Sequence, residues 1–560
     1  MAGCALLAAC EREEPPQPSR PSPPPELTQP GQPKLPRELA EPGSVSGSGG
    51  AGGAAPAVPR SWSEIPALPE GYSGAWFAVT SSSAGVYREP SFDSVKIGYL
   101  RNGSRVPVAA EPVSKKNCTG GWYALASGGF ACGNLGSTDL SHPEVKFATA
   151  APNLGDVLPY PYARNAKNGT PLYRTVPSRE QMELYEPYLL PKPAANAETK
   201  PARSDVVSGA SRPVMEGRPP DAGAPSSELG AALADGGLIT ASAPSDPEPE
   251  QPWWQRENIK ERLHEVKLQE LETDADDVLA KRMVTGFYVA VDRTFRWNAR
   301  SWYKTTKGLV TPSERFWQTA GSKFIGVELD AATWKLPVGW VYGGRKSAGT
   351  YLLNAETGEL SNDKSVDRFV PIALTGKSSE IRGTAYEETA AGTWIKRAHI
   401  RRTDPGPLPV DLKPDERWID VDLSSQTLVA FVGQKPIYAT LISSGKESKI
   451  EEKDHRTPRG EWRVREKHIT TTMDGDGSAA GDLPYSIEDV PYVMYYHRSY
   501  ATHGAFWHAN YGVQMSHGCV NLAPLDAKYL FFFADPPIPA GFHGVWATDA
   551  QPGTRIVIHD

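Results

Sequence analysis

Cys519 stands in the segment MSHGCVN, residues 515–521, and no other cysteine occurs in the last four hundred residues. A thiol becomes a nucleophile when a neighbouring base takes its proton. Histidine suits that role because its pKa lies near neutrality, and His503, His508 and His517 stand within sixteen residues upstream. These residues predict a cysteine nucleophile with a histidine base. The alternative is a buried cysteine among structural histidines.

The elements that must position this cysteine are predominantly strands. The segment RWIDVDLSSQTLVAFVGQKPIYATLISSG, residues 417–445, alternates apolar and polar residues around turn signals, and TPRGEWRV at 457–464 supplies another turn and strand. After the cysteine, PLDAKYLFFF at 524–533 predicts a short packing helix with proline in its first turn. A mainly β domain therefore surrounds the candidate nucleophile.

Seven segments of this region occur in an order that resembles the catalytic domain of the L,D-transpeptidases, the YkuD family. They are DVDLSSQTL, ATLISSG, HRTPRGEWRV, HGAFWH, SHGCVNL, PLDAKYLFFF and GTRIVI. The resemblance covers residues 416–560 and implies a YkuD-like β-sandwich with short helices. It implies that Cys519 is the nucleophile and His503 the general acid and base. His508 stays open as a substitute base, a residue lining the cleft or a core histidine.

The same resemblance implies a reaction and its partners. Cys519 attacks a peptidoglycan stem peptide and forms a thioacyl enzyme, which an amine of another stem or of an envelope protein resolves. Backbone N–H groups near the cysteine form an oxyanion hole. The residues expected to bind the oxyanion or substrate are Ser516, His517, Gly518, Asn521 and His508. We predict no cofactor and no metal, because no metal-ligand spacing occurs. An L,D-carboxypeptidase and a non-catalytic wall-binding protein remain the alternatives.

Composition sets the wider organisation. The chain has 560 residues, a formal net charge of -7, 52 Pro and 52 Gly, which predicts several folded domains joined by linkers and no nucleic-acid partner. VYREPS, GYLRNGSRV and GWYAL resemble bacterial SH3-like domains. We predict a leader at 1–10, a disordered tether at 11–68, an SH3-like domain at 69–145, an irregular and disordered linker at 146–252, a helix at 253–284, a second SH3-like or β-rich module at 285–410 and the catalytic domain at 416–560.

The amino terminus and the remaining cysteines predict an exported protein. MAGCALLAAC resembles the end of a bacterial lipoprotein signal, which implies lipidation of Cys10 and a membrane anchor through lipid alone. Glu11 is not the aspartate that retains lipoproteins at the inner membrane, so we expect the periplasmic side of the outer membrane. Cys118 and Cys132 are close in sequence and predict a disulfide, with two reduced thiols as the alternative.

Overall fold

The computed structural model describes residues 65–189, 253–255, 259–272, 276–330, 332–342, 345–476 and 483–560. These residues all belong to one compact unit that extends over 56–560. The predicted leader, with Cys10, and nearly all of the predicted tether lie outside them. The fold is mainly β, as predicted, with several sheets and few helices. No helix in the described part of the chain has the length and apolar character needed to cross a membrane.

The first module contains short antiparallel strands closed by a disulfide. Its elements are β1 (Trp76–Val79), β2 (Ser83–Tyr87), β3 (Lys96–Arg101), β4 (Arg105–Pro107), β5 (Trp122–Ala124), β6 (Phe130–Cys132), η2 (Gly133–Leu135), β7 (Gly136–Ser137) and α1 (Pro143–Phe147). Strand β1 pairs with β4 and β7, and β2 pairs with β3 and β6. In β2, Ala84 and Val86 are fully buried and their neighbours Gly85 and Tyr87 are not, as expected for an alternating strand. The SH3-like assignment stays a prediction.

The second module combines two stretches of chain that are far apart in sequence. Its elements are β8 (Tyr162–Asn165), β9 (Thr170–Tyr173), α2 (Arg179–Tyr185), η3 (Pro187–Leu189), β10 (Leu279–Met283), β11 (Tyr288–Trp297), β12 (Arg300–Thr305), β13 (Val310–Pro312), η7 (Ser313–Arg315) and β14 (Phe316–Thr319). Strand β8 pairs with β11 and β14, and β9 with β10 and β13. The prediction of an irregular linker over 146–252 is therefore wrong for residues 162–189.

The segment 253–284 is not the single helix that its apolar spacing predicts. It contains only η4 (Trp253–Gln255), α3 (Ile259–Arg262), η5 (Leu263–Glu265) and η6 (Leu268–Leu271) before β10, among its described residues. Leu263, Val266 and Leu271 are buried in one cluster with Phe287 and Val289 of the second module. Packing against a sheet thus overrides the helical periodicity, since short turns bury the same apolar side chains.

A third module follows, so the single module predicted at 285–410 is divided between the second module and this third one. Its elements are β16 (Val338–Val341), β17 (Ser347–Leu353), β18 (Leu360–Asp367), β19 (Pro371–Ile381), β20 (Thr384–Thr389), β21 (Trp394–Lys396), η8 (Arg397–His399) and β22 (Ile400–Arg402). These strands form a seven-stranded sheet in the order β18-β17-β21-β20-β19-β16-β22. Of the strands at 288–319, β11 and β14 pair with β8 and β13 pairs with β9, so the earlier part of the chain completes their hydrogen-bonding edges.

The C-terminal domain is a sandwich whose sheets enclose one helix. Its elements are β23 (Arg417–Asp422), β24 (Thr427–Val432), β25 (Lys435–Leu441), η9 (Glu451–Lys453), β26 (Gly460–Arg463), β27 (Glu466–Gly475), β28 (Tyr485–His497), β29 (Tyr500–Gly504), β30 (Val520–Leu522), α4 (Pro524–Phe533), β31 (Gly544–Trp546) and β32 (Arg555–His559). One sheet has the order β15-β25-β24-β23-β32-β26, with β15 (Val327–Glu328) at its edge.

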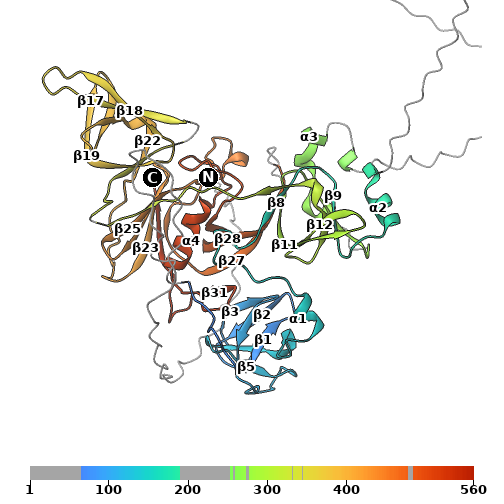
Figure 1. Ribbon diagram of the computed structural model, residues 1–560. Helices are drawn as coiled ribbons and strands as arrows, with labels where there is room; N and C mark the ends of the chain where they lie inside the picture. The colour runs from blue at the N-terminus through green and yellow to red at the C-terminus, as the bar shows by residue number, and fades with distance from the viewer. Residues whose placement is uncertain are drawn as a thin grey trace, which may run out of the picture. The chain divides into compact units, whose positions relative to one another are not determined.

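Helix α4 lies in the core of this sandwich, beside β28 (Figure 1). Leu530 and Phe531 of the helix, Ile419 of β23 and Tyr492 of β28 are fully buried in one cluster. The helix starts at Pro524, as predicted, since proline tolerates the first turn, where its missing N–H has no partner to lose. The strand that carries the candidate base, β29, pairs with β28 on one side and β30 on the other.

Candidate active site

Strands β29 and β30 bring the candidate base and nucleophile to one cavity. They pair in parallel, with His503 opposite Asn521, and opposed residues of neighbouring strands direct their side chains to the same face. Cys519 lies in the turn immediately before β30, two residues before Asn521. His503, Cys519 and Asn521 all line a cavity of about 490 Å³, which is within the range of ligand pockets.

The Cys519 thiol is protonated at neutral pH in the resting structure. It is the free cysteine of the described chain and is half-buried, and its Sγ lies 3.9 Å from the carbonyl oxygen of Ser499. Burial raises the pKa of the thiol to about 11, although the backbone N–H of Ala501 opposes that shift. The sulfur therefore requires a base for attack, because the thiolate is the nucleophilic form.

His503 is held as a neutral imidazole. The side chain is only 3% exposed, and burial lowers its pKa to about 4. Its Nδ1 lies 3.5 Å from the carbonyl oxygen of Gly504, which can only accept, so Nδ1 carries the proton and Nε2 is left as the basic nitrogen. Among the described residues no hydrogen bond joins the ring to Cys519, so the two groups share a cavity without being paired at rest.

His508 does not line the cavity and holds Asn521 in place. Its Nδ1 accepts a hydrogen bond of 3.3 Å from the N–H of Asn510, so in the neutral ring Nε2 carries the proton. The side-chain amide of Asn521 lies 3.1 Å from Nε2 and accepts that proton when its oxygen faces the ring, an orientation that also gives the otherwise unpaired Oδ1 a partner. Burial lowers the pKa of His508 to about 4. Of the three roles left open from the sequence, lining the cleft is wrong, because His508 is not part of the cavity wall; it contacts Asn521, which does face the cavity.

Ser516 and Gly518 shape the turn that presents the thiol. Ser516 Oγ donates to the carbonyl oxygen of Cys519 at 2.5 Å and accepts from the N–H of Gly518 at 3.1 Å. Gly518 has φ +119°, and a Cβ there would come within 2.4 Å of a Tyr500 ring carbon, so only glycine fits. The Gly518 N–H predicted for the oxyanion hole is already bonded to Ser516 in the resting structure.

Thr457 is a supporting residue to which the sequence interpretation gave no role. Its buried hydroxyl accepts from the N–H of Gly445 and donates to the carbonyl oxygen of Gly518, each at 2.9 Å. Lys446 N–H also donates to the carbonyl of Ser516 at 3.0 Å. Thr457 belongs to the HRTPRG segment that contributed to the family resemblance. The sequence thus contained a motif that includes this residue, but the motif did not show which groups its hydroxyl binds.

The remaining cavity wall comes from a hairpin and from the second module. Met473 of β27 and Tyr485 of β28 line the cavity together with Tyr288 of β11, which pairs in parallel with Ile487. His517 is exposed and stacks on Tyr485 with ring centroids 5.4 Å apart. The two strands of this hairpin, β27 and β28, are long, and residues 477–482 between them lie outside the described chain.

The two cysteines of the first module do not line this cavity. Cys118 and Cys132 are joined by a disulfide, with their Cα atoms 5.9 Å apart. Cys10 lies outside the described residues. The part of the chain that the structure describes contains no cluster of three or more His, Cys, Asp or Glu side chains able to hold a metal ion.

The model of the YkuD family, the L,D-transpeptidase catalytic domain, matches residues 416–558, which confirms the resemblance predicted for the C-terminal segment. No curated protein matches the chain. The SH3-like and lipoprotein assignments stay predictions.

Solved structures of L,D-transpeptidases are similar to this chain over about a quarter of its length. An Enterococcus faecium L,D-transpeptidase mutant is 25% identical over 26% of this chain and 50% of its own, with a TM-score of 0.19. The catalytic domain of an Enterococcus faecium L,D-transpeptidase acylated by ertapenem is 27% identical over 24% of this chain and 98% of its own, with a TM-score of 0.18. An L,D-transpeptidase from Xylanimonas cellulosilytica is 21% identical over 28% of this chain and 64% of its own, with a TM-score of 0.19. This chain thus covers about half of the first of these, and such low TM-scores support no further conclusion.

Proposed function

We propose that the C-terminal domain is an L,D-transpeptidase that acts on peptidoglycan stem peptides through a thioacyl enzyme on Cys519. The observation that carries the proposal is that Cys519 and a neutral His503 line one cavity on neighbouring strands. The family match over residues 416–558 supports it. A purely binding role has no need of a free thiol and a neutral imidazole in the same pocket.

The first half of the reaction transfers the stem to sulfur. Bound substrate brings the thiol and the imidazole together, and His503 Nε2 takes the proton as Sγ bonds to the carbonyl carbon of the stem. The carbonyl oxygen becomes an oxyanion, stabilised by backbone N–H groups of the turn. The imidazolium then gives its proton to the leaving amine, the carbon–nitrogen bond breaks, and the terminal amino acid departs.

The second half transfers the acyl group to an acceptor. An amine of another stem, or of an envelope protein, attacks the thioester carbon and loses a proton to His503. The sulfur leaves and takes that proton back, which restores the resting thiol and forms a new amide. Water in place of the amine gives the L,D-carboxypeptidase reaction with the same residues, so the acceptor distinguishes the two.

Product analysis tests this proposal. Purified tetrapeptide stems are incubated with the protein, and the products are identified by mass spectrometry. Cross-linked dimers that form with the wild type and are absent with Cys519→Ala support transfer; shortened monomers alone indicate hydrolysis. Unchanged stems from a folded wild-type protein whose Cys519 reacts with a small alkylating reagent would contradict both.

A carbapenem provides a second test that does not depend on the acceptor. Its strained lactam carbonyl imitates the scissile amide, so attack by Cys519 opens the ring and leaves a covalent adduct. Intact-protein mass spectrometry is expected to show one added inhibitor mass on the wild type and none on Cys519→Ala. No mass increase on the wild type would show that the thiol and the base do not cooperate.

We also propose that the protein is anchored in the envelope through lipid on Cys10. The support is the sequence of the amino terminus, in which a short apolar run ends at Cys10 and a polar, proline-rich segment follows. Two acyl chains bury enough methylene groups for stable anchoring. The wild type is expected to fractionate with outer membranes and Cys10→Ser to be released or unprocessed. Wild-type protein found in the soluble fraction would refute the anchor.

A further inference from the structure

A row of side chains extends from the catalytic cavity across the second module. Strand pairing places five residues in one register, each opposite the next on a neighbouring strand: Met473 of β27, Ile487 of β28, Tyr288 of β11, Arg164 of β8 and Trp317 of β14. Opposed residues of paired strands direct their side chains to the same face. The first three line the catalytic cavity, so Arg164 and Trp317 continue its wall beyond the rim.

The opposite face of the same strands packs into the core of the second module. Three residues that adjoin members of the row in sequence are buried there in one cluster, Ala163, Val289 and Phe316. The face with the row is instead open at its far end, since the Trp317 side chain is 61% exposed. Neighbouring strands lie about 4.8 Å apart, so Arg164 lies roughly 5 Å and Trp317 roughly 10 Å beyond Tyr288 along the row.

Arg164 carries its guanidinium to the rim of the cavity. A Cβ added to Gly286, which lines the cavity, would lie 3.6 Å from a terminal nitrogen of Arg164. The positive charge of Arg164 also opposes the rise in pKa that burial imposes on Tyr288. The Arg164 side chain is half-buried, and it makes no ion pair with a carboxylate in the part of the chain that the structure describes. It therefore retains N–H donors and a charge for an anion.

Trp317 orients this guanidinium. The Cζ atom of Arg164 lies 5.8 Å from the centre of the Trp317 indole ring, within the range of a cation–π contact. A planar guanidinium held against an aromatic face presents its N–H donors in a fixed direction. That arrangement suits recognition of a carboxylate, which accepts two parallel hydrogen bonds from an arginine.

We propose that Arg164, oriented by Trp317, pairs with a carboxylate of the bound stem peptide and so determines which stems the cavity accepts. This inference rests on the proposed transpeptidase function and names a substrate contact of that same site. A stem offers a carboxylate on either side of the attacked residue. One is the α-carboxylate of a γ-linked glutamate that precedes the attacked residue, and the other is the C-terminal carboxylate of the amino acid that departs.

Stem analogues identify which carboxylate is bound. Full-length Cys519→Ala protein, which cannot form the thioacyl enzyme, is titrated calorimetrically with L-alanyl-γ-D-glutamyl-L-lysyl-D-alanine. One analogue has an amide in place of the glutamate α-carboxylate, and a second has a C-terminal amide. Adding Arg164→Gln to the Cys519→Ala protein is expected to weaken the parent peptide at least about fivefold. The same change is expected to leave unaltered the affinity of the one analogue that lacks the paired carboxylate, and that analogue assigns the source.

Two results with Arg164→Gln would overturn the proposal. One is an unchanged affinity for the parent peptide, and the other is an equal loss of affinity for all three peptides, because the guanidinium then pairs with neither carboxylate. Trp317→Leu changes an exposed side chain and decides the question if Arg164→Gln fails to fold. It is expected to weaken the parent peptide and to spare the same analogue, since it removes the ring that orients Arg164; an unchanged affinity for the parent peptide in a protein without the ring would overturn the arrangement.

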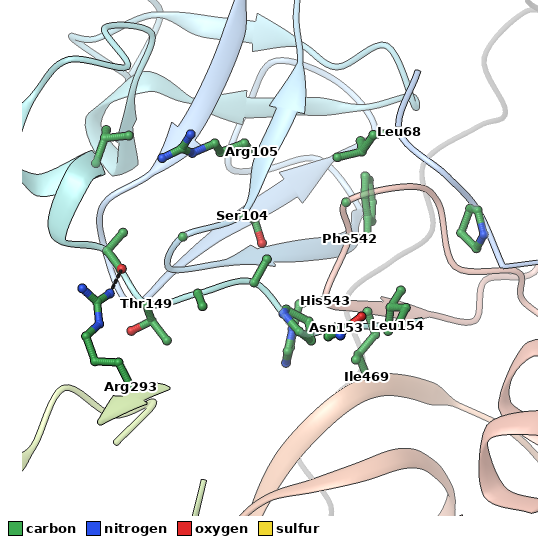
Figure 2. Close-up of a pocket in the computed structure, with 18 of the residues that line it drawn as sticks. Leu68, Ser104, Arg105, Thr149, Asn153, Leu154, Arg293, Ile469, Phe542 and His543 are labelled. Carbon is green, nitrogen blue, oxygen red and sulfur yellow. Dashed lines mark hydrogen bonds between the residues drawn. The ribbon is translucent and has the colours of Figure 1, made fainter. Parts of the chain in front are cut away.

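Arg105→Gln is the matched control. Arg105 is exposed and lies at a separate cavity of about 530 Å³, shown in Figure 2, which shares no lining residue with the catalytic one. This variant is expected to bind all three peptides unchanged, and a loss equal to that in Arg164→Gln would overturn the subsite. A parent peptide that binds the control and Arg164→Gln equally refutes the subsite and leaves the transpeptidase proposal standing. A parent peptide that binds neither protein contradicts the proposed function as well.

Discussion

Thr457→Val removes one hydroxyl group from the support of the catalytic turn at nearly constant side-chain volume. The hydroxyl is buried and joins the N–H of Gly445 to the carbonyl oxygen of Gly518, with two bonds of 2.9 Å. Valine leaves both backbone groups buried without that partner. Each unsatisfied buried group costs about 1–3 kcal/mol, so the loss of both bonds is expected to lower the local stability of the turn by roughly 2–6 kcal/mol.

Hydrogen exchange measures this loss at the turn itself. In mass-resolved exchange, peptides covering 515–522 are expected to exchange at least roughly 30-fold faster in Thr457→Val, since each 1.4 kcal/mol of opening free energy is about a factor of ten. Thr357→Val, an exposed threonine in the third module, is the matched control and leaves these peptides unchanged. Carbapenem acylation slows in Thr457→Val alone. Unaltered exchange at 515–522 would refute the role of Thr457 in holding the turn.

Further variants and conditions test the site and the disulfide. Cys519→Ala and His503→Ala are expected to lose stem turnover and carbapenem acylation while their circular dichroism spectra stay native. His508→Ala, outside the cavity, is expected to keep appreciable activity. If His508→Ala were inactive and His503→Ala active, His503 would not be the base. The acylation rate is expected to be constant between about pH 8 and 5 and to fall through pH 4. The reason is that the pKa of buried His503 is about 4 and only its neutral form accepts the thiol proton. A midpoint near 6.5, measured by stopped flow, would contradict the buried neutral ring. Reduction of the Cys118–Cys132 bond, with a sequence separation of 14, is expected to destabilise the first module by about 3 kcal/mol, and a melting temperature that ignores the reductant would argue against that contribution.

The meeting of the two proposed reacting groups in one cavity could be predicted because their spacing is local. Cys519 and His503 are sixteen residues apart, and the segment between them leaves one strand and enters its neighbour, so the pair meets in one cavity. The pKa values could not be predicted in this way. The sequence suggests a histidine that titrates near neutrality, whereas burial moves His503 to about 4 and Cys519 to about 11. Burial depends on packing from distant segments, which residue spacing does not contain.

Most of the fold that sequence patterns did not predict consists of strands that pair across long sequence separations. The strands at 162–173 have their hydrogen-bonding partners at 279–319, and nothing local in either segment specifies the other. The apolar spacing of Ile259, Leu263 and Val266 fits a helix and also fits three short turns packed against a sheet. The buried cluster with Phe287 and Val289 selects the short turns. Periodicity therefore predicts which side chains are buried more reliably than it predicts whether a helix, a strand or a turn carries them.

The catalytic cavity depends on the upstream modules through one buried carboxylate. Asp489 lies on β28, the strand that also supplies Tyr485 and Ile487 to the cavity wall. Arg101 of the first module binds its two oxygens at 2.6 and 2.8 Å, and Thr306 of the second module donates to the same group.

Burial alone would raise the pKa of Asp489, but the charge of Arg101 holds it at about 2, so the carboxylate is ionised at any pH at which the base functions. Removing one partner of such a pair leaves a buried charge uncompensated, which costs far more than an exposed pair contributes. The first two modules therefore act on the shape of the cleft, because the strand that forms its wall is fixed by an ion pair that crosses module boundaries.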